Sequence, residues 1–238
     1  MGSRSRTRRP RIQRFVRSSQ LLTSRHDRAT GYCRLKRLKN YRMATKGPVC
    51  GVLHLVDDAR GSVVMVGGAG GGIHGPVNSY EELAARLHED GVTAFRLEYR
   101  RPNYLKECVY DVLAAVDALG HRGIDRVVLV GWSFGGAVVI GAGAASEAVV
   151  GVATIASQNY GTKDAGKLSP EKSLLLIHGT ADTVLPYHLS QELYARAGEP
   201  KELVLYPGDG HGIEHHRSEM LDKLHEWSKG LLLLSAKN

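Results

Sequence analysis

The sequence predicts an α/β fold, in which a mostly parallel, doubly wound sheet is covered by helices on both faces. From residue 49 onward, short β-branched apolar segments alternate with segments of helical periodicity. This alternation is typical of parallel strands joined by helical crossovers. Several of the expected strands are followed by loops rich in glycine and in Ser, Asp or His. Because neither a repeat nor a second domain is indicated, the 238 residues fit one domain preceded by a tail.

Residues 1–44 are interpreted as a basic, disordered tail, and residues 45–238 as the folded domain. Residues 1–46 contain 15 Lys or Arg and a single acidic residue, Asp27, although the whole chain has a net charge of only +8. The folded part is therefore mildly acidic. Such a tail composition cannot bury enough apolar surface to offset the entropy of ordering.

Three interpretations of the tail compete. We favour Met43 as the natural start, because the residues that follow it lead directly into the first strand pattern. An organelle-import leader is the second interpretation, since such leaders are rich in Arg and Ser and poor in acid. Polyanion binding is the third, but no aromatic and basic interleaving supports a specific nucleic-acid partner.

The remaining global features favour a cytoplasmic protein. The three cysteines show no metal-binding or disulfide spacing, which favours a reducing compartment. No segment reads as a membrane span, because the longest apolar stretch is interrupted by Ser146 and Glu147. No metal or cofactor is expected, and no oligomeric state is predicted.

The elements follow one another in a regular order. The strands are expected at 49–56, 62–66, 92–98, 126–130, 149–156, 173–177 and 201–205, where the segments are apolar and β-branched. Helices are expected from Asn78 or Ser79 to Gly91, at 105–119, from about Ala137, at 189–197, and at the end around Met220, Leu224, Trp227 and Leu231. Their apolar residues recur at the spacing of one helical face, and Gly91 and Gly198 end two of them.

Residues 131–136, Gly-Trp-Ser-Phe-Gly-Gly, join an expected strand to an expected helix. A Gly-x-Ser-x-Gly segment in this context places its serine on a sharp turn, with the hydroxyl held out near a helix N-terminus. The glycines leave room for the neighbouring strand and helix. A glycine-rich turn with an incidental Ser133 is the alternative that the flanking pattern disfavours.

Three further loops are expected at the same edge of the sheet, because the carboxyl ends of parallel strands meet there. They are the glycine run 67–72, the segment around Asp182 and the segment around His211. Asp209 is a rival acid, whereas His74, His178 and His215 are rival bases. We expect His178 to be a structural histidine at a strand end. A dinucleotide site on the glycine run, with Glu98 as its acidic partner, is the weaker alternative.

From about Val49 to Leu234, the chain resembles the α/β-hydrolase superfamily. The motifs are Gly-Trp-Ser-Phe-Gly-Gly, His-Gly-Thr-Ala-Asp-Thr-Val-Leu-Pro and Gly-Asp-Gly-His-Gly, and the order serine, aspartate, histidine is that of the family triad. The chain is most similar to small esterases and dienelactone-hydrolase-like proteins. Because the best-known enzymes of that branch carry cysteine where this chain has Ser133, lactone specificity is not implied. The segment 157–172 is too short for a multi-helix cap.

The resemblance implies a role for each site residue. Ser133 is the expected nucleophile, His211 the base and Asp182 the acid that orients it. The oxyanion would be bound by the backbone N–H of Phe134 and by that of Ala69, with Gly70 next best.

Arg100, Arg101 and Trp132 are the candidates for substrate binding. The two arginines follow the strand that ends at Glu98, so they are expected near the site. They form either a clamp for a substrate carboxylate or, slightly favoured, a solvated pair.

The expected function is therefore that of a serine hydrolase that cleaves small-molecule esters through an acyl-enzyme. Amidase or peptidase activity on small substrates is the nearest enzymatic alternative. A non-catalytic ligand-binding protein with the same fold is the alternative from another class.

Overall fold

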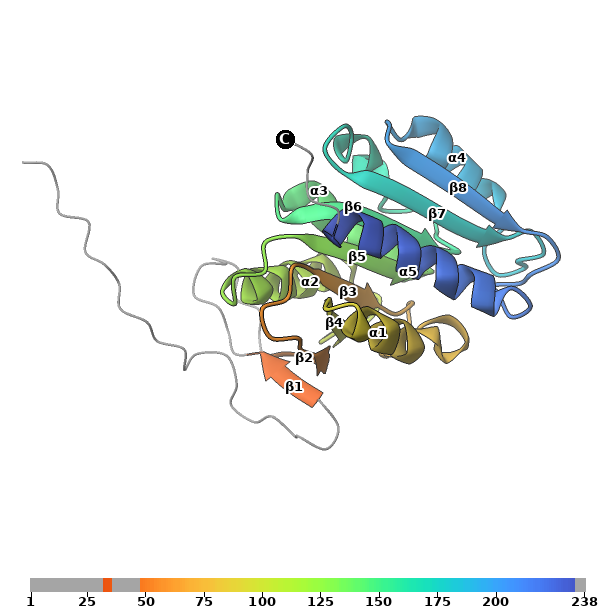
Figure 1. Ribbon diagram of the computed structural model, residues 1–238. Helices are drawn as coiled ribbons and strands as arrows, with labels where there is room; N and C mark the ends of the chain where they lie inside the picture. The colour runs from red at the N-terminus through yellow and green to blue at the C-terminus, as the bar shows by residue number, and fades with distance from the viewer. Residues whose placement is uncertain (1–31, 36–47, 234–238) are drawn as a thin grey trace, which may run out of the picture.

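The structure, a computed structural model, describes residues 32–35 and 48–233 (Figure 1). Its strands are β1 (Tyr32–Leu35), β2 (Val49–His54), β3 (Ser62–Val66), β4 (Thr93–Glu98), β5 (Val127–Trp132), β6 (Val149–Ile155), β7 (Ser173–Gly179) and β8 (Lys201–Tyr206). Its helices are α1 (Ser79–Glu89), α2 (Leu105–Gly120), α3 (Phe134–Ala145), α4 (His188–Arg196) and α5 (Arg217–Leu233), with short 3-10 helices η1 (Pro76–Asn78) and η2 (Lys163–Lys167).

All eight described strands belong to one sheet, in the order β1-β2-β4-β3-β5-β6-β7-β8. β2 pairs antiparallel with both β1 and β4, and every other pairing is parallel. The predicted fold class, a mostly parallel doubly wound sheet, is confirmed. The carboxyl ends of β3 to β8 lie at one edge, which therefore collects the loops that carry the candidate residues.

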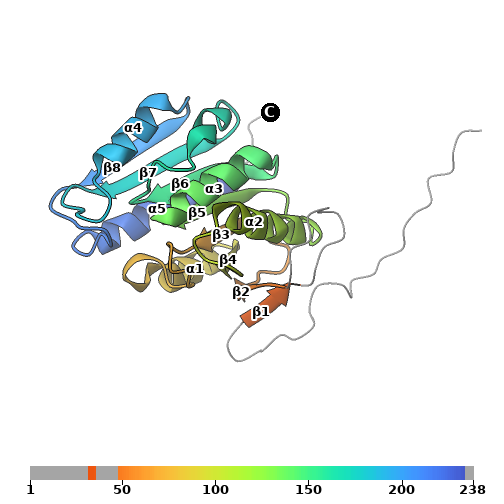
Figure 2. The same ribbon diagram turned by 180° about the vertical axis from the view of Figure 1, so that it is seen from behind.

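Helices cover both faces of the sheet. α1 and α5 lie on one face (Figure 1), and α2, α3 and α4 lie on the other (Figure 2). The alternation of side chains along β3 follows the same division: Val63 and Met65 pack with the core of α1 and α5, whereas Val64 and Val66 pack with the core of α2, α3 and α4. Both faces of the central strands are buried, which explains their continuous apolar sequences.

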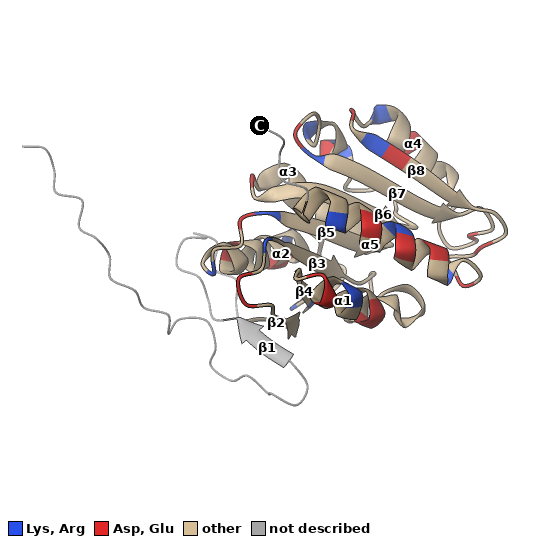
Figure 3. Cartoon of the chain, in the orientation of Figure 1, with Lys and Arg blue, Asp and Glu red and all other residues tan. Residues whose placement is uncertain are grey.

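Charged residues lie mainly on the helices and loops, and the central strands carry almost none (Figure 3). This distribution is expected for strands that are covered on both faces. Within the described residues, no helix is both long enough and apolar enough to cross a membrane.

The structure differs from the sequence prediction in an additional strand, β1, and in the start of α3. β1 lies inside the segment 1–44, where no strand was expected, and pairs with β2. Such a strand is specified by its partner, because its own four residues carry little periodic pattern. The rest of that segment lies outside the described residues, so the domain boundary at 44 stays a prediction. α3 begins at Phe134, directly after Ser133, rather than near Ala137.

The segment between β6 and β7 contains the five-residue η2 as its only helix. The described part of the chain thus has no multi-helix insertion at the position where a cap was considered.

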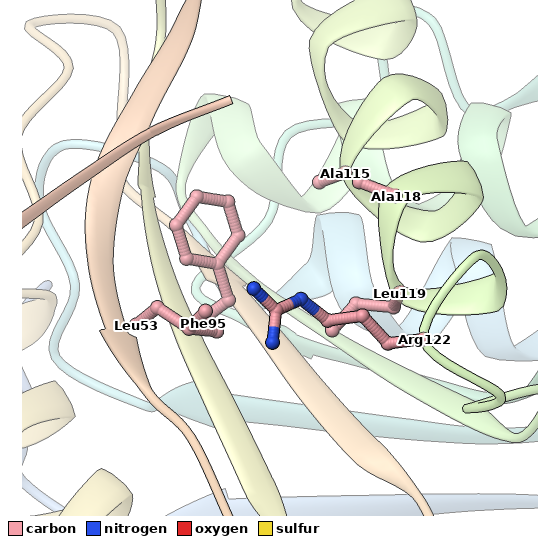
Figure 4. A pocket seen from close by; sticks show the side chains of 6 residues that line it. All are labelled: Leu53, Phe95, Ala115, Ala118, Leu119 and Arg122. Carbon is pink, nitrogen blue, oxygen red and sulfur yellow. The ribbon is translucent and has the colours of Figure 1, made fainter. Parts of the chain in front are cut away.

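A small apolar cavity lies between β2, β4 and the C-terminal half of α2 (Figure 4). Its volume is about 10 Å³, which is enough for about one water molecule. Leu53, Phe95 and Leu119 line it, and the Arg122 side chain extends toward Phe95. No nucleophilic side chain lines this cavity. It lies at the C-terminal end of α2, whereas the loops that carry the candidate residues lie at the other end of that helix, near Leu105.

Candidate active site

Ser133 occupies a strained turn between β5 and α3. Its backbone has φ 57° and ψ −121°, a conformation that residues with a Cβ rarely adopt. The Ser133 N–H donates to the Ile155 carbonyl at 2.8 Å, which fixes the turn to β6. Phe134 is the first residue of α3, so its N–H is among those that have no partner within the helix.

The glycines around Ser133 are required by close backbone contacts. A Cβ at Gly131 would lie 2.2 Å from the Gly135 carbonyl oxygen, and a Cβ at Gly135 would lie 2.5 Å from that of Gly67. Any side chain at either position would separate β5, α3 and the loop after β3. The sequence interpretation of these glycines as spacers agrees with this geometry.

Asp182 and His211 meet across the ends of β7 and β8. His211 Nδ1 lies 2.7 Å from Asp182 Oδ2. The Asp182 side chain is fully buried, and 18% of the His211 side chain is exposed. Because Nδ1 donates to the carboxylate, His211 Nε2 carries the lone pair in the neutral ring and can act as a base.

The Asp182 carboxylate is held in its charged form. Burial, the largest single influence, would raise its pKa, but the hydrogen bonds from His211 and from the Leu185 and Val184 N–H groups together lower that pKa below its ordinary value. Val184 N and Leu185 N lie 2.8 and 2.9 Å from Asp182 Oδ1. The carboxylate is therefore available as a hydrogen-bond acceptor for the imidazole at neutral pH.

Trp132 fixes the His211 loop beside Ser133. Its Nε1 donates to the His211 carbonyl at 3.0 Å, and the two rings have centroids 5.5 Å apart. The substrate-binding role expected for Trp132 stays a prediction beside this contact. Among the described residues, no hydrogen bond joins Ser133 to His211, and the Trp132 indole is the contact that brings their two loops together.

His178 was expected to be a structural histidine at a strand end, and in the structure its ring contacts the Asp182 carboxylate. Its Nε2 lies 2.8 Å from the Leu185 carbonyl and 3.1 Å from Asp182 Oδ2, while its Nδ1 lies 2.6 Å from Ser190 Oγ. Since a carbonyl only accepts, Nε2 carries the proton and Nδ1 accepts from the Ser190 hydroxyl. Burial lowers the pKa of His178, which favours this neutral form.

Asp209, the rival acid, is bonded to other histidines. His215 Nδ1 lies 3.0 Å from Asp209 Oδ1, and His216 Nδ1 lies 2.5 Å from Asp209 Oδ2. The backbone N–H groups of both histidines also donate to this carboxylate. Asp209 therefore closes the loop before α5. Its own carbonyl accepts from Ala181 N–H at 2.8 Å and so joins the loop to that of Asp182.

Of the rival bases, His215 thus belongs to the Asp209 loop, and His74 is exposed in the loop after β3.

The glycine run after β3 approaches Ser133 through Gly68. A Cβ at Gly68 would lie 3.4 Å from Ser133 Cβ and 3.8 Å from its Oγ. Ala69 and Gly70, the predicted oxyanion residues, are exposed. They lie at the tip of a turn in which the Gly71 N–H donates to the Gly68 carbonyl at 3.0 Å. Gly68 is therefore the glycine of the run whose close contact is with Ser133. Sequence reasoning missed Gly68, because any glycine in the run fits such an approach.

Arg100 and Arg101 do not form a free clamp. Arg100 Nε bonds Asp111 Oδ1 of α2, a carboxylate that also accepts from the Arg100 N–H at 3.0 Å. The Asp111 side chain is fully buried and that of Arg100 is 12% exposed, so a solvated pair is wrong for Arg100 as well. Arg101 lies over the Tyr104 ring and bonds Glu107 at 3.2 Å. Both guanidinium groups thus tie the loop after β4 to α2.

Two neighbouring cavities open beside the Ser133 turn. One of 430 Å³ is lined by Phe134, by the start of α2 and by Gln158 and Tyr160 after β6. The other, of 840 Å³, lies between α2, α3 and η2. Cavities of this size accommodate small organic ligands.

The strand order, with its loops converging beyond the carboxyl ends, defines an α/β-hydrolase fold. The sequence model of the phospholipase/carboxylesterase family matches residues 98–227, which is more than half of the chain. The chain therefore belongs to the phospholipase/carboxylesterase family of α/β-hydrolases. The matched region includes Ser133, Asp182 and His211.

Solved structures of other proteins have the same fold. Dienelactone hydrolase from Anabaena variabilis superposes with a TM-score of 0.71 at 18% identity, over 80% of this chain and 95% of that one. Est1E from Butyrivibrio proteoclasticus gives a TM-score of 0.71 at 16% identity, over 85% and 99% of the two chains. At such identities the likeness concerns the fold alone.

Curated relatives are closer in sequence. The uncharacterized protein YfhR of Escherichia coli O157:H7 is 31% identical over 172 residues, which is 59% of this chain and 60% of the relative. YfhR of Escherichia coli K12 is 30% identical over 188 residues, or 62% and 66%. The chain thus spans less than two thirds of the length of these relatives.

Proposed function

We propose that this protein is a serine hydrolase that cleaves ester-type acyl substrates, with Ser133, His211 and Asp182 as its triad. The observation that carries the proposal is the 2.7 Å contact between His211 Nδ1 and Asp182 Oδ2. It orients the imidazole with Nε2 free, on a loop that Trp132 holds beside the Ser133 turn. Membership of a phospholipase/carboxylesterase family favours esters over amides.

The chemistry follows from these positions. Ser133 Oγ attacks the ester carbonyl carbon while His211 Nε2 takes the hydroxyl proton. The carbonyl electron pair moves to the oxygen, where the Phe134 and Ala69 N–H groups stabilise the negative charge. Collapse of this intermediate breaks the ester bond, and His211 gives its proton to the departing alkoxide. Water then attacks the acyl-enzyme in the same way and releases the acid and Ser133.

A fluorophosphonate probe tests the proposal directly, because it phosphonylates only an activated serine. We expect one adduct per chain by intact mass, located on Ser133, and hydrolysis of 4-nitrophenyl acetate. Ser133→Ala should lose the adduct and lower kcat by roughly 10⁴–10⁶-fold. Ser157→Ala, in the neighbouring loop after β6, is the matched control and should keep both.

The same experiment separates the alternatives. Rapid labelling of Ser133 with hydrolysis of anilides at a rate comparable to esters would favour an amidase. A folded protein that neither labels nor turns over would favour a ligand-binding protein and would contradict the proposal.

A further inference from the structure

The two cavities beside Ser133 form one continuous depression. Leu105, Lys106 and Tyr160 line both of them. The smaller cavity includes Phe134, whose N–H is the proposed oxyanion donor, and the larger one extends away from it along α2 toward Arg196 of α4. We refer to the joined cavities as the α2 groove. Because Phe134 directly follows Ser133 in the chain, the groove begins one residue from the proposed nucleophile.

The charges of the α2 groove are unbalanced. Lys106, Lys163 and Arg196 line it, and no carboxylate among the described residues forms an ion pair with any of them. The two acidic residues of the groove are already neutralised, since Glu107 pairs with Arg101 at 3.2 Å and Asp164 pairs with Lys167 at 2.8 Å.

Lys106 and Arg196 have uncharged partners, and Lys163 forms no ion pair within the described part of the chain. The Lys106 ammonium stands 6.0 Å from the centre of the Tyr110 ring, and Arg196 bonds Asn159 Oδ1 at 3.1 Å and the Thr162 hydroxyl. Arg196 shares the Asn159 side chain with Glu192, whose carboxylate accepts from the Asn159 amide at 2.5 Å. The positive charge without a carboxylate partner in the groove is therefore that of Lys106 and Lys163.

The groove also carries unusual apolar exposure. Three large hydrophobic side chains are exposed in the described part of the chain, namely Tyr104, Tyr160 and Val184. Tyr104 and Tyr160 line the smaller cavity, with 50% and 79% of their surface exposed. Exposed aromatic residues that gather at one concave site are typical of ligand-binding surfaces.

We propose that the α2 groove binds an anionic group of the substrate, so that the enzyme prefers esters that carry a negative charge several atoms from the scissile bond. The aromatic rim would hold the apolar part of the substrate, and Lys106 and Lys163 would hold the anion. This inference rests on the proposed function, because it assumes that Ser133 attacks the bound ester. A carboxylate and a phosphate share the chemistry that the lysines recognise.

The test compares 4-nitrophenyl monoesters of glutarate, adipate and suberate with their neutral methyl-capped counterparts, and an ω-phosphate ester of matched length is the third arm. We expect kcat/KM of the wild type to favour the anionic esters at low ionic strength, and the preference to decline in 0.5 M NaCl. The arm with the larger preference identifies the anion. Since the lysines are exposed, each should contribute about two- to fivefold.

Variants locate the effect. Lys106→Gln and Lys163→Gln should each lower kcat/KM for the anionic esters and leave the neutral esters unchanged, and the double variant should lose about tenfold of the preference. Lys229→Gln is the matched control, because Lys229 lies on α5 at the opposite face and pairs with Asp90. Equal kcat/KM for anionic and neutral esters in the wild type would overturn the proposal. So would a preference that the double variant retains.

A binding measurement keeps this inference separate from the proposed function. Ser133→Ala should bind 4-phenylbutanoate more tightly than 4-phenylbutanamide, and the Lys106→Gln/Lys163→Gln change should remove the difference. If no ester is hydrolysed but this difference is found, the proposed function fails and the anion site stands. If esters are hydrolysed and both ligands bind alike, the anion site fails alone.

Discussion

Asp182 and Asp209 follow the adjacent strands β7 and β8, and their carboxylates have the same kinds of partner. Both side chains are fully buried. Each carboxylate lies within hydrogen-bond distance of two backbone N–H groups and two imidazoles. For Asp182 the N–H groups are those of Val184 and Leu185, and the imidazoles are those of His211 and His178. For Asp209 both the N–H groups and the imidazoles belong to His215 and His216. In both cases burial is the largest influence and hydrogen bonds lower the pKa despite it.

The two carboxylates differ in where their histidines come from. The partners of Asp209 lie six and seven residues further along one loop, and the ring of His215 is 78% exposed. His211 lies 29 residues from Asp182, on the loop of another strand, and Trp132 ties it to the Ser133 turn. Burial and hydrogen-bond number therefore do not identify a catalytic acid. We propose Asp182 as the catalytic acid because it is connected to a second histidine-bearing loop, which Trp132 ties to the Ser133 turn.

Replacing each acid with its amide gives the largest contrast. Asp182→Asn should lower kcat by roughly 10³–10⁴-fold, because an amide cannot stabilise the imidazolium and favours the wrong tautomer. Asp209→Asn should stay within about tenfold of the wild type when assayed well below its melting temperature. Steady-state hydrolysis of 4-nitrophenyl acetate measures both. A nearly wild-type Asp182→Asn beside an inactive Asp209→Asn would reverse the assignment of the acid.

The stability of the fold should depend on Asp209. Asp209→Ala leaves the His215 and His216 N–H groups without their acceptor, which should lower the free energy of unfolding by about 2–3 kcal/mol. For a domain of this size, that corresponds to a melting temperature roughly 5–10 °C lower. Differential scanning calorimetry measures the change. An unchanged melting temperature would mean that water replaces the carboxylate and that Asp209 does not hold the loop.

His178 tests whether the second imidazole on Asp182 matters. His178→Leu removes an N–H donor from the carboxylate, so Asp182 should interact more strongly with the His211 imidazole. We expect kcat/KM to fall about tenfold and its acidic limb, expected near 6.5, to move to higher pH. His178→Gln, which can donate from a similar position, should restore much of both. A changed rate with an unmoved limb would indicate a merely structural role.

His215→Gln is the matched control, since His215 serves Asp209 in the same manner. It should leave the rate and the acidic limb of the pH profile unchanged. A limb that moves equally in this variant would show that the effect does not pass through Asp182.

Much of this arrangement was predictable from local sequence. The strand at 62–66, the helix from Leu105 and the turn at Ser133 are each specified by residues close to one another, so periodicity and the glycines identified them. The pairing of Asp182 with His211 was expected from motif order, which places both at strand ends on one edge of the sheet.

The contacts that sequence did not predict depend on partners remote in the chain. Arg100 was interpreted as solvated or substrate-facing because nothing near it signals that Asp111 will be buried beneath it. β1 needs β2 as its template. The engagement of Trp132 with the His211 backbone joins residues 79 positions apart, and no periodic pattern encodes such a contact.

The smallest expected effect is the pH dependence of stability that His178 contributes. Its lowered pKa means that the unfolded chain, with an ordinary value of about 6.5, binds a proton that the folded protein resists. Stability should therefore fall as the pH decreases from about 6.5 toward the folded-state pKa of His178. The contributions of Asp182 and Asp209 act in another window. Their lowered pKa values stabilise the fold above about pH 4, and this stabilisation is lost as the pH falls further.

Urea unfolding of wild type and His178→Gln between pH 7.5 and 4.5 separates the two windows, because every other histidine is common to both proteins. The wild type should be the more stable at pH 7.5, and its advantage should shrink as the pH drops below 6.5, by about 1.4 kcal/mol for each unit by which the pKa of His178 is lowered. Curves that run parallel over this range would mean that His178 titrates alike in the folded and unfolded states. The imidazole would then not be held neutral, and the difference between the two carboxylates would rest on His211 alone.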